Sequence, residues 1–517
     1  MIQLYNTLTQ AKEPLTPRDP GKVGIYCCGP TVYNYIHVGN ARPYVVFAVL
    51  RSWLRRRGYE VTLVTNITDV DDKIIAKAQA EGRDPADVAA QYTAAYIEDT
   101  DRLGLPRPDI EPRATETIPE IIDLVCQLVS RGHAYEAGGS VYFRVRSFPE
   151  YGKLSRQRLE ELEEGVRVEH EPGKEDPLDF AVWKAARPGE PSWDSPWGRG
   201  RPGWHIECSA MGLRYLGAGF DIHGGGRDLV FPHHENEIAQ AEAAGLPFAR
   251  VWMHVGMVRS GGEKMAKSVG NIFLLREVLD RYEPAVFILY LLMAHYRSPL
   301  EFSAAKLDEA KAALRRFRDA VADIDFRVAN AARAREQGHW PDLTLRAETA
   351  GIAFAEHMDD DLNTAAALGE LFALVGELHR YLTLVDRGEA PLDTEALLAV
   401  RGTLLHCLEA LHVPVSPGGP TVTAVGSLAG EGAKECVTGE MALLPAARLA
   451  AEGRWDDLEL VYRDRLACGD ASYACALRDH YRAERDWARA DRLREEMVAA
   501  GFEVRDTPQG TQVVPRG

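Results

Sequence analysis

Two short motifs in this 517-residue chain carry side chains suited to binding phosphate. The first is His37-Val-Gly-Asn40, which follows an apolar run and begins a helical pattern. The N-terminus of a helix offers N–H groups and a partial positive charge, so it attracts phosphate. Gly39 would let a ligand approach the backbone, and His37 and Asn40 can donate to the oxygens of a reacting α-phosphate. The tetrapeptide is common by chance, so a surface histidine beside a glycine is the alternative.

The second motif is the segment Lys-Met-Ala-Lys-Ser at residues 264–268, which is flanked by glycines. Lys264 and Lys267 can hold a triphosphate as mobile point charges, and the alternative is an exposed basic loop. The two motifs support each other. An early His-x-Gly-x box and a later Lys-Met-x-Lys-Ser loop around a Rossmann pattern resemble the signature of class I aminoacyl-tRNA synthetases. The resemblance implies an adenylate-forming site.

A third group of residues consists of metal-ligand types that are dispersed along the chain. His233 and Glu237 are four residues apart, so on a helix they share a face and can chelate one ion. Cys28 and Cys208, expected at distant strand ends, could complete a tetrahedral zinc site. Dispersed ligands are weak evidence by themselves. The alternatives are that both cysteines are small buried hydrophobes and that His233 and its neighbour His234 serve the nucleotide.

These residues require a scaffold, and the first hundred residues predict one. Residues 22–28 form a short apolar run that ends in Gly-Pro, residues 41–57 have helical spacing before Gly58, and residues 61–66 are rich in β-formers. Strand, helix and strand make a βαβ unit. The fold class expected is α/β, with a Rossmann-type doubly wound parallel sheet and the ligand at the carboxyl ends of the strands.

Later segments predict further domains. From about residue 84 to residue 190 the chain has a mostly helical, polar pattern, which we interpret as an inserted connective domain, and the β-turn-helix pattern resumes at residues 203–210 and 220–226. Amphipathic patterns from 304 to 412 predict an antiparallel helical bundle. Residues 413–435 are rich in Gly, Pro, Ser and Thr and predict a linker. One charged helix is expected from about 475 to 500, before Gly501.

Composition narrows the possible classes of protein. The chain has 60 basic and 77 acidic residues and a net charge of −17, which argues against nonspecific coating of nucleic acid but permits a local basic surface. Basic clusters such as residues 55–57 and 315–318 are best interpreted as solvated helix faces. Eight cysteines are too few for a disulfide scaffold. No membrane-length apolar run or secretory signal is visible, so we expect a cytoplasmic protein that binds no membrane.

Several longer runs are specific enough to identify a family. They are Tyr-Cys-Cys-Gly-Pro-Thr-Val-Tyr at 26–33, Thr-Asn-Ile-Thr-Asp-Val-Asp-Asp-Lys at 65–73, Gly-Arg-Pro-Gly-Trp-His-Ile-Glu-Cys-Ser-Ala-Met at 200–211, the stretch 221–237, Trp-Met-His-Val-Gly at 252–256, the lysine segment and His-Tyr-Arg-Ser at 295–298. Through these runs the chain closely resembles the cysteinyl-tRNA synthetases. The resemblance covers about residues 1–410 and returns at 475–517.

The resemblance implies one catalytic zinc ion per chain, held by Cys28, Cys208, His233 and Glu237. Neighbouring residues of a strand point to opposite faces, so only one of the two adjacent cysteines can be a ligand, and the family pattern selects Cys28. In the family the zinc binds the thiolate of substrate cysteine. Because a serine hydroxyl is a poor zinc ligand, the metal would reject serine, and no editing domain would be needed.

The resemblance also implies the remaining site residues and the partners. Thr68 and Trp204 would line the pocket for cysteine, and His37, Asn40, Lys264 and Lys267 would be catalytic. The expected ATP-binding residues are His37, Gly39, Asn40, Gly224, Gly225, Asp228 and Lys267, with Mg²⁺ accompanying ATP. Asn40 stands where the motif often has His, and Ala266 where Ser is common. Neither departure should abolish activity.

The function implied is ATP-dependent activation of L-cysteine, followed by its transfer to tRNA(Cys), by a protein expected to be monomeric. The expected organisation is a Rossmann domain in two halves (1–84 and 201–255), a connective insertion (85–200), a lysine-loop and stem-contact region (256–303), an anticodon-side bundle (304–412), a linker (413–435) and a small tRNA-binding unit (436–517). One alternative is a paralogue that passes cysteine to a small amine, as in mycothiol biosynthesis. Another is a catalytically inactive RNA-binding relative.

Overall fold

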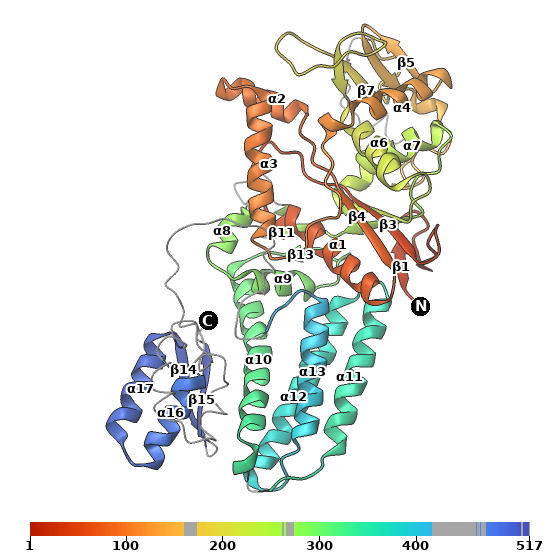
Figure 1. Ribbon diagram of the computed structural model, residues 1–517. Helices are drawn as coiled ribbons and strands as arrows, with labels where there is room; N and C mark the ends of the chain where they lie inside the picture. Colours follow the sequence, from red (N-terminus) through yellow and green to blue (C-terminus); the bar gives the residue numbers. More distant parts are fainter. Residues whose placement is uncertain are drawn as a thin grey trace. The chain divides into compact units, whose positions relative to one another are not determined.

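The computed structural model describes residues 1–159, 173–260, 263–264, 273–334, 336–415, 462, 466, 472–507 and 510–515 (Figure 1). The chain forms two compact units. The first comprises Met1–Ala310, Ala355–Ala367 and Ala410–His412, and the second comprises Lys311–Phe354, Leu368–Glu409 and Val413–Gly517. This division is coarser than the organisation expected from the sequence, whose boundaries stay predictions.

A four-stranded parallel sheet forms the centre of the first unit. Its order is β10-β9-β3-β4, and its strands are β3 (Lys22–Cys27), β4 (Glu60–Thr65), β9 (Ile222–Gly226) and β10 (Val251–Val255). The order places β3, the first of these strands, in the middle of the sheet. β3 and β9 end beside each other, since Cys27 pairs with Gly224. The expected Rossmann-type parallel sheet is confirmed, and its carboxyl edge is where a ligand is expected.

Helix α1 (Val38–Arg56) connects β3 to β4 and buries most of its apolar residues. It begins three residues before the helix expected at 41–57. The reason is a capping box, in which the His37 side chain accepts from a backbone N–H of the first turn and the Asn40 side chain accepts from the His37 N–H. Gly58, at φ +91°, follows the end of the helix, where only glycine is unstrained.

Further elements flank this sheet. An antiparallel hairpin of β1 (Gln3–Asn6) and β2 (Ala11–Pro14) contacts the sheet through β10. Further helices of the unit are α2 (Asp72–Glu81), α3 (Pro85–Asp101), α6 (Trp204–Leu216), α7 (Glu235–Ala243), α8 (Leu275–Leu279) and α9 (Pro284–Leu292). A small sheet of order β12-β11-β13 comprises β11 (Val258–Ser260), β12 (Glu263–Lys264) and β13 (Leu300–Glu301).

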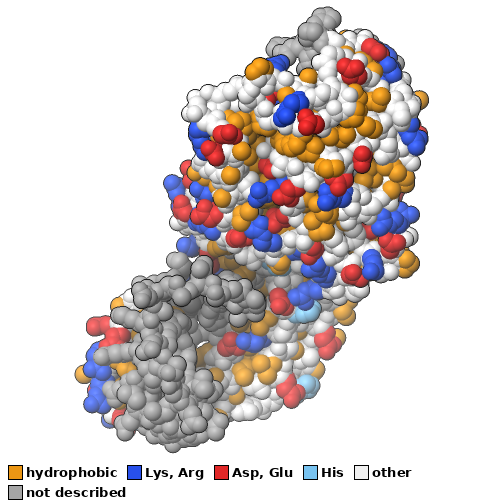
Figure 2. All heavy atoms as spheres, turned by 45° about the horizontal axis from the view of Figure 1, so that its top comes forward, with side chains coloured by type: hydrophobic (Ala, Val, Ile, Leu, Met, Phe, Trp, Pro, Cys, Tyr) orange, Lys and Arg blue, Asp and Glu red, His pale blue; other side chains and the backbone are white. Residues whose placement is uncertain are grey.

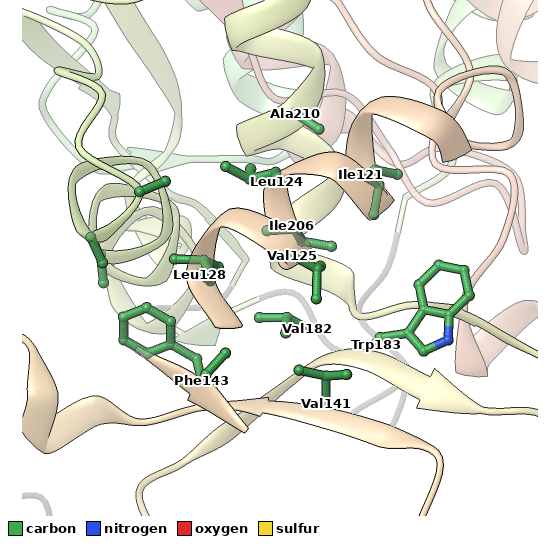
Figure 3. Close-up of a cluster of buried hydrophobic side chains, with 14 of the residues drawn as sticks. Ile121, Leu124, Val125, Leu128, Val141, Phe143, Val182, Trp183, Ile206 and Ala210 are labelled. Atoms are coloured by element: carbon green, nitrogen blue, oxygen red, sulfur yellow. The ribbon is translucent and has the colours of Figure 1, made fainter. Parts of the chain in front are cut away.

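The insertion differs from its expected mostly helical structure. Besides α4 (Ile118–Ser130), it contains an antiparallel sheet of β5 (Ala134–Ala137), β6 (Ser140–Phe143), β7 (Phe180–Ala185) and β8 (Gly200–Pro202). Figure 3 shows the apolar face of α4, with Ile121, Val125 and Leu128, directed at Val141 and Phe143 of this sheet. The strands are short, and a long segment separates β6 from β7, so their alternation did not stand out against a helical pattern.

Four helices form the bundle expected at 304–412: α10 (Ala304–Ala329), α11 (Pro341–Asp359), α12 (Thr364–Arg387) and α13 (Thr394–Ala410). Short helical turns occur at Ala114–Glu116, Val145–Ser147, Arg227–Leu229, Val230–His234 and Ala331–Arg333. Phe317 of α10 stacks on Phe372 of α12, with ring centroids 4.5 Å apart. In the ranges given above, no helix is long and apolar enough to cross a membrane.

The C-terminal residues correct another expectation. The single charged helix predicted at 475–500 is two helices, α16 (Ser472–Ala483) and α17 (Trp487–Ala499), followed by the hairpin β14 (Phe502–Thr507) and β15 (Gly510–Pro515). The chain turns at Arg485, which has φ +62°, and Asp486 caps α17. The two helices and the hairpin bury a core of their own that includes Leu477, Leu493 and Met497. The expected linker, apart from residues 413–415, lies outside the described residues.

The charged surface agrees with the interpretation of the basic clusters. On the face shown in Figure 2, basic and acidic side chains are interspersed among the described residues. Arg55 pairs with Asp109 at 2.8 Å, and Arg315 lies 3.6 Å from Asp319 one turn along α10. These arginines have acidic neighbours, as solvated helix faces do.

Candidate metal and nucleotide site

The four predicted metal ligands converge. One ligand atom each from Cys28, Cys208, His233 and Glu237 lie within 4.8 Å of one another. Cys28 follows the end of β3, Cys208 lies on α6, His233 lies in the turn before α7, and Glu237 lies in the first turn of α7. The Sγ atoms of the two cysteines are 3.8 Å apart, and His233 Nε2 is 2.9 Å from Glu237 Oε1.

Two details differ from the expected arrangement. Cys208 is on a helix and not at a strand end, because the segment after Gly203 has helical rather than alternating burial. Of the two adjacent cysteines, Cys28 presents its thiol to Cys208 and to Glu237, at 3.8 and 3.6 Å. Burial raises the pKa of the Cys27 thiol, so that thiol stays protonated.

The ionisation of the cluster suits a cation. The hydrogen bond with Cys28 lowers the pKa of Cys208 to about 6, whereas burial raises the pKa of Cys28 well above its usual range. Against the effect of burial, the attraction of Glu237 raises the pKa of His233 to about 10. Also against burial, His223 and His233 hold the pKa of Glu237 well below its usual range. A divalent cation would displace the protons of Cys28 and His233 and balance the anionic groups.

The donor set fits zinc. Two sulfurs, one imidazole nitrogen and one carboxylate oxygen are all ligands that zinc accepts, and the two thiolates make the set softer than a magnesium or calcium site. Cys208, His233 and Glu237 are each at most 2% exposed, so the site is shielded from bulk water.

A chain of hydrogen bonds leads from this cluster to the N-terminal hairpin. His234 Nε2 is 3.3 Å from Cys28 Sγ, His234 Nδ1 is 2.8 Å from His254 Nε2, and His254 Nδ1 is 2.8 Å from Thr7 Oγ1. Burial lowers the pKa of His254 to about 3, so that imidazole is neutral. The two rings then share one proton across their contact. Cys28, His223, His234 and Glu237 form a second group with metal-ligand spacing.

Sequence reasoning did not assign roles to Thr7, His223 or His254. A signal for the two histidines was present, because both lie in segments that carry the family resemblance. Nothing in the sequence pointed to Thr7, since its contact with His254 depends on how the hairpin packs against β10.

The expected pocket residues adjoin the cluster. The ring of Trp204 stacks on that of His233, with centroids 4.4 Å apart, and the ammonium of Lys73 lies 5.4 Å from the Trp204 ring. Thr68 is buried and accepts a hydrogen bond from Asn66. The Asn66 side chain also accepts from the Gly29 N–H, one residue after Cys28. Both expected residues therefore lie where a substrate could contact the metal ligands.

The His37 turn is built around the capping box. His37 Nδ1 accepts from the Gly39 N–H at 3.0 Å, so a neutral His37 carries its proton on Nε2. A Cβ at Gly39 would lie 2.9 Å from this ring, so a larger residue would displace the histidine. Asn40 accepts from the His37 N–H at 3.1 Å. The turn holds an imidazole N–H donor at the positive end of α1.

The glycines of β9 have a packing role that the sequence did not reveal. A Cβ at Gly224 would lie 2.2 Å from the carbonyl oxygen of Met253 and 2.3 Å from the ring of Phe47. A Cβ at Gly225 would lie 2.9 Å from Leu229. Close packing of β9 therefore excludes side chains at both positions. Asp228 lies in the short helical turn that follows the strand.

The lysine motif is described only in part. The backbone of Lys264 belongs to β12, and Lys267 lies outside the described residues. The chain beyond the motif returns to the His37 turn, where the Val38 N–H donates to the carbonyl of Phe273 and the Leu275 N–H donates to that of Ile36, both at 3.0 Å. The chain that follows the lysine motif is therefore joined to the His37 turn at Leu274.

Comparison with known proteins gives consistent matches. Residues 14–312 match the family model described as "tRNA synthetases class I (C) catalytic domain", and residues 353–411 match the "DALR domain". A curated "Cysteine--tRNA ligase" from Pelotomaculum thermopropionicum is 44% identical over 100% of both chains. One with the same name from Carboxydothermus hydrogenoformans is 48% identical over 90% of this chain and 96% of its own.

Solved structures show a shared fold. A methionyl-tRNA synthetase from Mycobacterium tuberculosis, solved with methionyl-adenylate, superimposes with a TM-score of 0.55 over 76% of this chain and 90% of its own, at 16% identity. An identity this low supports similarity of fold alone.

Proposed function

The chain belongs to the cysteine–tRNA ligases, a family of class I aminoacyl-tRNA synthetases, and we propose that its four convergent ligands hold the zinc ion that selects cysteine. The protein activates L-cysteine with ATP and transfers it to tRNA. The observation that carries the proposal is the convergence of Cys28, Cys208, His233 and Glu237 on one buried point. When bound there, zinc supplies a soft Lewis acid that favours the thiolate of cysteine over the hydroxyl of serine.

The choice between the two groups of metal-ligand residues rests on Cys208. The pKa of Cys208, about 6, makes this side chain a thiolate at neutral pH. The group that contains Cys208 offers zinc two sulfur ligands, whereas the other group offers one sulfur and two imidazoles. Zinc is better suited by the set with two thiolates. His223 and His234 then act behind the ligands: His223 Nε2 lies 2.6 Å from Glu237 Oε2, and His234 contacts Cys28. Such contacts orient metal ligands and tune their charge.

Adenylate formation depends on the residues of the His37 turn and of the lysine motif. A carboxylate oxygen of the substrate attacks the α-phosphorus of ATP, and pyrophosphate leaves. His37 at the N-terminus of α1 would donate to the α-phosphate, and Asn40 holds the turn and adds a donor group. Lys264 and Lys267 would neutralise the charge that develops on the leaving pyrophosphate, with Mg²⁺ accompanying ATP. In the second step a hydroxyl of the terminal adenosine attacks the carbonyl carbon, and AMP leaves.

The C-terminal unit would supply part of the tRNA contact. The arginines Arg482, Arg485, Arg489 and Arg492 recur at three- and four-residue intervals, which predicts one basic helix face, but that prediction is wrong because the chain turns at Arg485 between α16 and α17. Arg482 pairs with Asp506 at 2.6 Å, and Arg492 lies 3.8 Å from Glu496, so both arginines have acidic partners within the protein. What supports a role in RNA binding is Trp487, which is 56% exposed beside exposed Arg485. Exposed aromatic rings with adjacent arginines stack unpaired bases.

Replacing Trp487 by Ala should weaken tRNA binding without changing cysteine activation. Loss of one stacked base costs about 1–3 kcal/mol, so we expect KM for tRNA(Cys) to rise about tenfold. Cysteine-dependent pyrophosphate exchange should stay as in the parent protein. Arg505→Ala, on the same unit and paired with Glu503 at 3.1 Å, is the matched control. A chain ending after Pro414 should lose charging while keeping exchange.

Charging assays separate this proposal from its rivals. Attachment of cysteine to a tRNA(Cys) transcript is the expected activity, whereas transfer to a small amine with no charging would identify the paralogue. If Trp487→Ala and the shortened chain both charged tRNA(Cys) with an unchanged KM at several salt concentrations, the C-terminal unit would not be a tRNA-binding element.

A further inference from the structure

Arg276 connects three segments around the His37 turn. It lies in α8, two residues after Leu274, and its guanidinium contacts Asp99 near the end of α3. Arg276 Nε donates to both carboxylate oxygens of Asp99, at 3.1 and 3.2 Å, and Nη2 lies 3.0 Å from Oδ1. The Asp99 side chain is 0% exposed. A buried carboxylate held in this way fixes the guanidinium in one orientation.

The same guanidinium covers the ring of Tyr35. The Cζ atom of Arg276 lies 3.9 Å from the centroid of the Tyr35 ring. The ring of Tyr92, on α3, also packs against that of Tyr35, with centroids 5.3 Å apart. Tyr35 precedes His37 by two residues. Arg276 therefore fixes the segment that leads into the capping box from the side of α3.

A second connection runs through the backbone. His37 and Leu274 form an isolated antiparallel bridge, through the hydrogen bonds from Val38 to Phe273 and from Leu275 to Ile36. Leu275 is 0% exposed, which holds the start of α8 in place. The bridge and the Arg276–Tyr35 contact both join α8, or the residue before it, to the segment that carries His37.

We propose that Arg276 is a positioning residue for adenylate formation, which acts through Tyr35 and the Leu274 bridge to place the His37 side chain. The proposal rests on the role proposed above for His37 at the α-phosphate. A misplacement of about 1 Å at a reacting group can cost about 10²-fold in rate, so the Arg276–Asp99 pair has kinetic consequences without touching substrate.

A second ion pair between the same two segments provides the comparison. Arg102, which follows α3, lies 2.7 Å from Asp280, which follows α8, and both side chains are much more exposed than Asp99, at 35% and 66%. It spans the same elements, but its hydrogen bond joins Arg102 to Asp280 and does not involve Tyr35 or the His37 turn. Exposed pairs of this kind contribute little to stability. Replacing Arg102 therefore tests whether adenylate formation depends on any ion pair between α3 and α8, or on the Arg276–Asp99 pair in particular.

The test measures the two half-reactions separately in full-length Arg276→Ala, Arg276→Lys, Asp99→Asn and Arg102→Ala, with thermal unfolding of each. We expect Arg276→Ala to lower kcat for cysteine-dependent pyrophosphate exchange about 10- to 100-fold with KM for cysteine within about twofold. Transfer from preformed cysteinyl-adenylate to tRNA should be unchanged. Asp99→Asn should act in the same direction, Arg276→Lys should restore part of the rate, and Arg102→Ala should match the parent.

Each outcome decides a point. If Arg276→Ala slows both half-reactions equally and lowers the unfolding midpoint, or leaves exchange unchanged, the positioning role is overturned. Equal losses in Arg102→Ala would overturn it too. His37→Ala is measured alongside: if it activates cysteine normally, the proposed role of His37 fails, whereas a loss in His37→Ala with none in Arg276→Ala rejects the present inference alone.

Discussion

Replacing Cys208 by serine should remove zinc from the protein and, with it, the ability to activate cysteine. The thiolate of Cys208 would be replaced by a hydroxyl that stays protonated at neutral pH and binds zinc poorly. The pKa of about 6 means that the native side chain offers its anion without cost near pH 7. We expect bound zinc to fall from about one per chain to near none, and cysteine-dependent exchange to fall by more than about 10²-fold.

Cys27→Ser is the matched control for this substitution. The same atom changes in a cysteine that is also buried and adjacent in sequence to a ligand, but whose thiol is outside the group of four converging ligand atoms. Elemental analysis of both purified variants is the measurement. Zinc should be retained in Cys27→Ser and lost in Cys208→Ser. Full zinc and normal cysteine affinity in Cys208→Ser would remove Cys208 from the ligand set.

Replacing Lys267 by alanine should slow adenylate formation by about 10²–10³-fold while KM for cysteine stays nearly constant. The lysine is proposed to meet charge that develops on the phosphates in the transition state, so its loss affects the rate more than ground-state binding. Its motif is joined to the His37 turn by the bridge at Leu274, seven residues further along the chain.

Single-turnover measurement of adenylate formation tests this role. Lys306→Ala, an exposed lysine paired with Glu309 at 2.7 Å on α10, removes the same charge away from the site and should leave the rate unchanged. If activation in Lys267→Ala were as fast as in the parent, the lysine loop would serve another purpose.

Local patterns sufficed for the parts of the fold that depend on neighbours in sequence. The βαβ unit could be predicted because a short apolar run, a helical repeat before Gly58 and a β-rich run follow one another directly. The motif at 37–40 was placed at the opening of this helix, but the helical spacing was assigned only from residue 41, since the capping box uses histidine and asparagine in place of the commoner capping residues.

Other features depend on contacts that no local pattern encodes. The four strands of the insertion are only three to six residues long, and β6 pairs with β7 across the long segment between Phe143 and Phe180. The polar helical pattern of the sequence therefore led to a prediction of helices. The break in the C-terminal helix occurs at Arg485, whose backbone is in the left-handed conformation. No glycine or proline at this position indicates the break in the sequence.

In the candidate site, too, local spacing predicted some features, whereas others depend on tertiary contacts. His233 and Glu237 could be paired by their spacing, but the position of Cys208 on α6 could not, because dispersed ligands meet only through the sheet topology. Cys28 was chosen over Cys27 by family resemblance alone, and the geometry around Glu237 agrees with that choice. Thr7 contacts His254, and Arg276 contacts Tyr35 two residues before His37. Both contacts arise from tertiary packing and had no signal in the sequence.

X-ray absorption at the zinc edge, recorded with and without L-cysteine, tests the central claim most directly. The zinc-loaded protein should show two sulfur ligands at about 2.3 Å together with nitrogen or oxygen ligands, as expected for Cys28, Cys208, His233 and Glu237. Saturating cysteine should raise the sulfur count to three, and serine at the same concentration should leave it at two. A sulfur count that does not change with cysteine would contradict selection of the substrate by the metal.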